Sequence, residues 1–163
     1  MVVIRGTRKL LARMQCDTVS DPPPSTTTLG DWYAHILFTK PQVVLCVSEH
    51  GRLPIVMPAR EIRTVAARLP LAAARVLVAL GIGRDVFEHE LTAMRQVVFA
   101  KTASRSMLST INDFAIATRW ALADHPEMTF EDVSLELAET PVGPMDYDHP
   151  AAVVRRLFST VGR

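Results

Sequence analysis

The stretch FAKTASRSMLSTINDF, residues 99–114, places a lysine, an arginine and several hydroxyl side chains between an apolar run and a segment with helical apolar spacing. This spacing predicts a helix over 104–123, with Thr102 or Ser104 as its N-cap. The first backbone N–H groups of a helix have no acceptor inside it and carry a partial positive charge. Cationic and hydroxyl side chains beside them would complete a site for a phosphate or a carboxylate. The predicted ligand-binding residues are Lys101, Ser104, Arg105, Ser106 and Asn112.

Helical geometry places Arg105, Ser109 and Asn112 on one stripe beside the apolar face, where Asn112 would orient a ligand. Asp113 points elsewhere and is a secondary candidate. A purely structural role is the alternative. In that role the hydroxyl residues cap the helix, Arg105 pairs with a carboxylate and Asn112 bonds to a loop carbonyl.

Three further residues near position 33 are secondary candidates. Trp32 and Tyr33 are adjacent aromatics that could stack on a base or another flat ligand, although aromatic residues at the start of a strand usually belong to a core. His35 lies in a predicted strand and could face either the core or a cleft. If the protein is an enzyme acting on a phosphodiester or a nucleotide, Arg105 would stabilise developing charge and Ser106 or His35 would handle a proton.

The sequence gives little indication of a metal site, a cofactor site or a membrane segment. The five histidines and two cysteines show no HExxH or CxxC spacing, so we predict no metal site and no cofactor. Cys46 lies in the apolar run VVLCV and is expected to be a buried, reduced thiol. The N-terminus does not resemble a signal peptide, and the apolar runs are shorter than the roughly 18 residues that span a bilayer. We therefore expect a cytoplasmic protein that does not enter a membrane.

The charge balance limits the partners. Lys and Arg total 18 against 17 for Asp and Glu, so the whole surface is not built to coat a polyanion. Basic residues recur in 5–13 and in 60–75, and they would form a patch only if the two runs converge. Scattered cations would not give useful nucleic-acid affinity at physiological salt. The partners that we consider are a phosphate-containing ligand or nucleic acid, and a partner protein.

The order of predicted elements indicates a single α+β domain over 1–163. It has a small, mostly antiparallel sheet packed with five to six helices, and Pro70 is expected to separate two of them. A Pro/Ser/Thr-rich loop at 17–31 would cross the surface as a tether or a flap. The predicted strands are a meander over 32–57, with an edge strand containing Pro54 and Pro58, and strands near 2–4, 96–101 and 132–138.

The segment around 129–138 fits two structures. The alternation of Val133, Leu135 and Leu137 with polar residues favours a strand. A helix capped by Thr129 with Asp132 is the competing prediction.

The segments KTASRSMLSTINDF, LGDWYAHILF, LPIVMPAR and LELAETPVGP together resemble a family of small bacterial proteins built on a domain of unknown function. The resemblance covers most of the chain, and its most specific part is Lys-Thr-x-x-Arg-Ser-x-Leu-x-x-x-Asn-Asp. The family has a glycine where this chain has Ser109 and a serine where it has Thr110. The resemblance singles out Lys101, Arg105, Ser106, Asn112 and Asp113 and implies no activity.

From these observations we expect a binding or regulatory protein with an anion site at the start of the 104–123 helix. The alternatives are an enzyme that processes a phosphodiester or nucleotide at the same place, and a structural partner in a protein complex.

Overall fold

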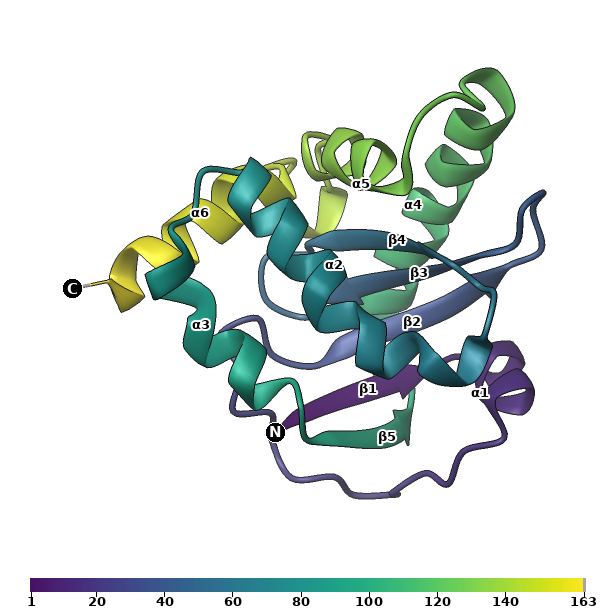
Figure 1. Cartoon of the computed structure of the whole chain (residues 1–163), viewed down its shortest axis with the longest axis horizontal. Helices are drawn as coiled ribbons and strands as arrows, with labels where there is room; N and C mark the ends of the chain where they lie inside the picture. The colour runs from purple at the N-terminus through teal and green to yellow at the C-terminus, as the bar shows by residue number, and fades with distance from the viewer. Residues whose placement is uncertain (163) are drawn as a thin grey trace.

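The computed structural model of the chain describes residues 1–162. Its strand β1 (Val2–Gly6) pairs with a neighbouring strand on each side. Its sheet has five strands in the order β4-β3-β2-β1-β5 (Figure 1). The other strands are β2 (Trp32–Leu37), β3 (Val43–Ser48), β4 (Pro54–Pro58) and β5 (Val97–Lys101). The meander and the strands expected near 2–4 and 96–101 are therefore confirmed.

Six α-helices surround the sheet within residues 1–162. The helices are α1 (Arg8–Met14), α2 (Val65–Ala79), α3 (Arg84–Ala93), α4 (Arg105–Asp124), α5 (Phe130–Ala138) and α6 (Pro150–Val161), with short 3-10 turns η1 (Ile62–Thr64) and η2 (Gly143–Met145). Pro70 was expected to separate two helices, but it lies inside α2. The single α+β domain matches the sequence prediction.

Half of the strand pairings are parallel, so the expected mostly antiparallel sheet is in fact mixed. β1 runs parallel to both β2 and β5, whereas β2, β3 and β4 form antiparallel pairs. The carboxyl ends of β1, β2 and β5 therefore point to the same end of the sheet. Because α1 follows β1 and α4 follows β5, both helices begin at that end (Figure 1).

The sheet separates two hydrophobic cores. Trp32, Ala34 and Ile36 on one face of β2 pack with residues of α1, α2, α3 and α6. Tyr33 and Leu37 on the other face pack with α4 and α5. This alternation follows from the period of two in a strand. Figure 1 shows α2 in front of the sheet and α4 behind it.

The segment 130–138 is a helix, so the predicted strand near 132–138 is wrong and the competing prediction is confirmed. The Thr129 hydroxyl accepts from the Asp132 N–H at 3.0 Å, and the Asp132 carboxylate accepts from the Thr129 N–H at 3.3 Å. This reciprocal capping box stabilises the first turn. Val133 and Leu137, four residues apart, are both buried, as one face of a helix requires.

α5 also covers part of the sheet edge. β4 is an edge strand, as Pro54 and Pro58 predicted, and its Val56 N–H donates to the Ser134 hydroxyl at 2.8 Å. A buried strand edge needs such partners, because an unpaired backbone N–H away from water is costly.

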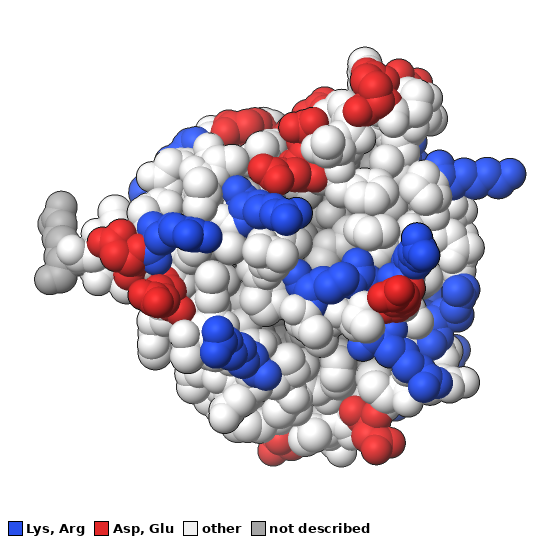
Figure 2. Space-filling view, viewed as in Figure 1, with Lys and Arg blue, Asp and Glu red and all other residues white. Residues whose placement is uncertain are grey.

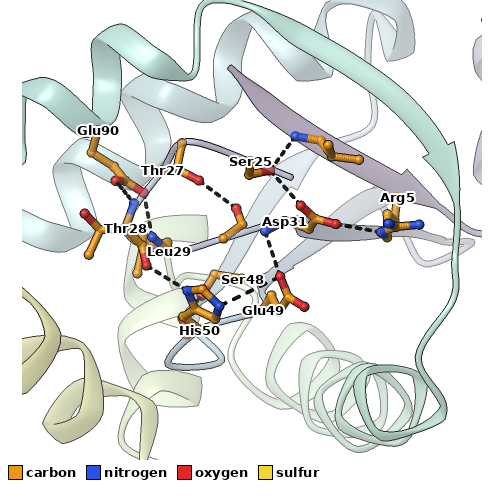
Figure 3. A network of polar contacts seen from close by, with 12 residues as sticks. Arg5, Ser25, Thr27, Thr28, Leu29, Asp31, Ser48, Glu49, His50 and Glu90 are labelled. Carbon is orange, nitrogen blue, oxygen red and sulfur yellow. Dashed lines mark hydrogen bonds and ion pairs between the residues drawn. The ribbon is translucent and has the colours of Figure 1, made fainter. Parts of the chain in front are cut away.

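The proline-rich segment 17–31 is attached at several points. Ser25 accepts from the Val3 N–H at 2.8 Å, and the N–H of Val19 donates to the carbonyl of Phe99 at 2.8 Å. Glu90 on α3 is buried, and its carboxylate accepts from the N–H groups of Thr28 at 2.6 Å and Leu29 at 3.0 Å (Figure 3). The segment therefore lies along β5 and β1 instead of standing free.

Of the part of the chain that the structure describes, no helix is both long and apolar enough to cross a membrane.

We predict that Glu90→Ala lowers the free energy of unfolding by about 2 kcal/mol or more, because two backbone donors lose their acceptor. Glu88→Ala on the exposed side of α3 is the matched control and should change it by less than about 0.5 kcal/mol. Urea unfolding of the two variants measures the difference. Equal stabilities would contradict the role of Glu90 in holding the segment.

Candidate functional site

The start of α4 has the cap that the sequence predicted. The Ser104 hydroxyl accepts from the Met107 N–H at 3.2 Å. This contact satisfies one of the N–H groups of the first helical turn. The N–H groups of Arg105 and Ser106 have no acceptor within the helix, because no helical carbonyl lies four residues before them. Lys101, Arg105 and Ser106 are exposed beside them. Neither Lys101 nor Arg105 forms an ion pair within residues 1–162.

Arg52 joins this group from the turn between β3 and β4. Its Nη2 donates to the Ser106 hydroxyl at 3.1 Å, across 54 residues of sequence. Its Nη1 is buried and has no hydrogen-bond partner among the described residues. Its backbone φ of 54° is left-handed, a conformation that sequence patterns rarely predict for arginine. No motif in the sequence indicated Arg52.

Arg5 lies opposite Ala100 on the neighbouring strand β5, and its side chain reaches the end of that strand. Its Nε donates to Asp31 Oδ2 at 2.7 Å, and its Nη1 donates to the carbonyl of Lys101 at 3.1 Å. Asp31 also accepts from the Ser25 hydroxyl at 2.6 Å, and its own N–H donates to Glu49 (Figure 3). Arg5 is therefore neutralised locally by Asp31 and serves to fix the end of β5.

Burial shifts the pKa of two side chains here. The pKa of Arg52 is lowered by loss of solvent, an effect that the charges of Glu49 and Tyr33 oppose. An arginine in a protein nevertheless stays protonated. Burial raises the pKa of Tyr33, while the charge of Arg5 lowers it. At neutral pH the group therefore contains a cationic Arg52 beside an uncharged Tyr33.

The secondary candidates occupy different environments. Trp32 is fully buried in the core under α2, and the Tyr33 ring is buried on the opposite face of the sheet, so neither ring offers a face to a ligand in solvent. Asn112 and Asp113 are exposed on α4. At 1.5 Å per residue, Asn112 lies roughly 10 Å along the helix from Arg105. It is therefore beyond the first turn, where a small anion would bind.

His35 is half-buried at the end of the sheet from which α1 begins. Its Nδ1 is 2.8 Å from the hydroxyl of Thr7, the residue before α1. Burial lowers its pKa, and the positive charges of Lys9 and Arg119 lower it further. Within residues 1–162, the His35 side chain forms a hydrogen bond with Thr7 and none with Ser106.

Comparison with known proteins gives one result. The model of a family described as a domain of unknown function, DUF6933, matches residues 3–153. No curated protein and no solved structure matches the chain. Within residues 1–162, no three His, Cys, Asp or Glu side chains are grouped so that they could hold a metal ion.

We predict that His35 makes the stability depend on pH. Because its pKa in the folded protein is below the unfolded value of about 6.5, the unfolded chain binds the proton first as the pH falls. The stability that neutral His35 contributes is complete above about pH 6.5 and is lost as the pH falls towards the folded pKa.

Urea unfolding between about pH 5 and pH 8 should therefore show a steeper loss of stability at low pH for the wild type than for His35→Gln. His125→Gln removes an exposed histidine at the end of α4 and is the control. Parallel curves for wild type and His35→Gln would contradict the prediction.

Proposed function

We propose an anion-binding function for this chain, which belongs to the DUF6933 family of domains of unknown function. The ligand is a small anion, a phosphate or a carboxylate, held at the start of α4. The binding groups are the first backbone N–H groups of α4, the side chains of Lys101, Arg105 and Ser106, and Arg52 from the neighbouring turn. The protein would act as a binding or regulatory protein.

The state of Arg52 is the observation that carries this proposal. Its guanidinium is half-buried and positively charged, yet one of its two terminal nitrogens has no acceptor among the described residues. A buried donor without a partner is costly, and an anion is the acceptor that best satisfies a guanidinium. The bond from Arg52 to Ser106 sets this side chain beside the first turn of α4.

The local charge balance supports the same ligand class. Lys101 and Arg105 have no ion-pair partner within residues 1–162, so both can turn towards a ligand. Asp31 is paired with Arg5, which reduces its repulsion of an incoming anion. Glu49, Asp146 and Asp148 line one cavity with Arg52. Asp148 is paired with Arg156, and Glu49 and Asp146 are exposed to solvent that screens their charge.

Binding without chemistry is favoured over the enzymatic alternative. Ser106 accepts a hydrogen bond from Arg52, a cation that cannot act as a base towards a serine. His35 is held by Thr7 instead. An enzyme that processes a phosphodiester would need a base within reach of its nucleophile.

A protein partner and a location in the bacterial cytoplasm remain proposals that rest on the sequence arguments above. Cys16 and Cys46 are free thiols in the structure, which fits a reducing compartment.

We predict that inorganic phosphate shifts the amide NMR signals of Arg105 and Ser106 in a saturable way. Arg105→Gln should weaken the binding by roughly tenfold or more, because a hydrogen bond to a charged group contributes about 1.5–3 kcal/mol. Arg95→Gln removes an exposed arginine at the opposite end of β5 and is the matched control, with unchanged affinity expected.

Acetate and AMP in the same titration distinguish a carboxylate ligand from a phosphate ligand. If millimolar phosphate leaves the signals of residues 104–107 in place, or if Arg105→Gln and Arg95→Gln bind equally well, the anion site is excluded.

A further inference from the structure

Two runs of basic residues, about fifty positions apart in sequence, meet at the carboxyl end of the parallel strands. Arg13 from α1 and Arg60 from the turn after β4 line one groove of about 510 Å³, together with Pro41 and Gln42. Arg63 in η1 donates to the side chain of Gln15, directly after α1. We call Lys9, Arg13, Arg60 and Arg63 the basic belt.

The basic belt is accessible and largely unneutralised. All four side chains are exposed, and none forms an ion pair within residues 1–162. Glu61 is the acidic residue that lines the same groove. Figure 2 shows blue side chains gathered on the right around one red side chain, whereas other red side chains lie at the top, at the left and at the lower edge of the view. The belt is therefore a local positive surface on a protein whose net charge is only +1.

Phe38 adds an aromatic surface to the basic belt. It follows β2 and is 53% exposed, unlike the buried Trp32 and Tyr33. Lys9 Nζ lies 6.0 Å from the centre of the Phe38 ring, and Arg13 Cζ lies 5.9 Å from it. Phe38 is thus an exposed ring with two cations of α1, Lys9 and Arg13, beside it. Single-stranded nucleic acids stack their bases on surfaces of this kind.

We propose that the basic belt and Phe38 bind single-stranded nucleic acid. A base stacks on Phe38, Lys9 and Arg13 contact the adjoining phosphates, and Arg60 and Arg63 contact the next ones across the groove. The convergence matters because charges separated by more than about 8 Å are screened at physiological salt. This site is separate from the anion site of Arg52 and α4 and does not depend on it.

The shape of the surface favours a single strand over two other polyanions. In a duplex the bases are stacked inside and cannot reach Phe38 without being unpaired. A membrane-surface helix would need a free apolar face, but Leu10 and Met14 of α1 are buried in the core. A flexible strand can place phosphates on both walls of the groove and a base on the ring.

Fluorescence anisotropy with labelled RNA and DNA strands of about a dozen nucleotides tests the proposal. Phe38→Ala should weaken binding by roughly five- to 150-fold, as expected for the loss of one stacked base. The double variant Arg13→Gln/Arg60→Gln should reduce the slope of log affinity against log salt by up to about 1.4, since each phosphate contact on a single strand contributes about 0.7.

Two control variants match these changes outside the belt. Trp120→Ala removes an aromatic that is 65% exposed on α4, and Arg95→Gln removes an exposed arginine beyond α3. Both should bind the oligonucleotides as the wild type does. All substituted side chains are exposed, so thermal unfolding should confirm that each variant is folded.

Several results would overturn the proposal. They are Phe38→Ala binding as tightly as the wild type, a blunt duplex of the same length binding as tightly as the single strand, and no binding of either strand at low salt. Retention on phosphatidylserine vesicles without oligonucleotide binding would show instead that the belt is a membrane-facing surface.

Discussion

The parallel pairing of β1 with both of its neighbours is the constraint on which the rest of the structure depends. Since β1, β2 and β5 run in one direction, the chain leaves all three at the same end of the sheet. α1, the turn with Phe38, and the start of α4 are gathered there as a consequence. The end of β4 adds Arg60 and Arg63 to that end. The position of the basic belt and of the start of α4 thus follows from strand direction, whereas Arg52 comes from the turn after β3, which lies beside the start of β2.

The carboxyl end of the sheet stays positively charged because the ion pairs of the structure involve arginines elsewhere. Arg5, which lies within the sheet, is paired with Asp31, and Arg155 and Arg156 are paired near α6. The cations at the surface of the carboxyl end have no such partners among the described residues. Burial also lowers the pKa of His35 there, so it adds no further charge at neutral pH. An uncompensated cluster of this kind costs stability through repulsion, and anion binding would relieve it.

Local patterns predicted most of the elements and the cap of α4, because caps, turns and apolar periodicity lie within a few residues of each other. The same patterns wrongly predicted a strand near 132–138. The helix there has only nine residues, and its apolar positions fit both the alternation of a strand and the spacing of a helix. Local patterns also failed for the direction of β1 pairing, which depends on partners far along the chain. The sequence showed that the segments containing Arg13 and Arg60 are basic, but it did not show that these two segments meet in the folded protein.

The candidate site shows the same limit. Sequence reasoning selected Lys101 at the end of β5, Ser104, Arg105 and Ser106 at the start of α4, and Asn112 about two turns further along. It could not find Arg52, whose bond to Ser106 spans 54 residues. It also chose the adjacent aromatics Trp32 and Tyr33, which the core buries, and passed over Phe38, whose exposure depends on where β2 ends. Contacts between distant segments decide which polar and aromatic side chains reach solvent.

The central claim is that converging cations at the carboxyl end of the sheet hold a polyanion. A crystal structure of the full chain with a short single-stranded oligonucleotide tests it most directly. The account predicts a base on the Phe38 ring, with phosphates between Arg13 and Arg60. An oligonucleotide lying across α5 and α6, with the groove between Arg13 and Arg60 holding only water, would contradict it.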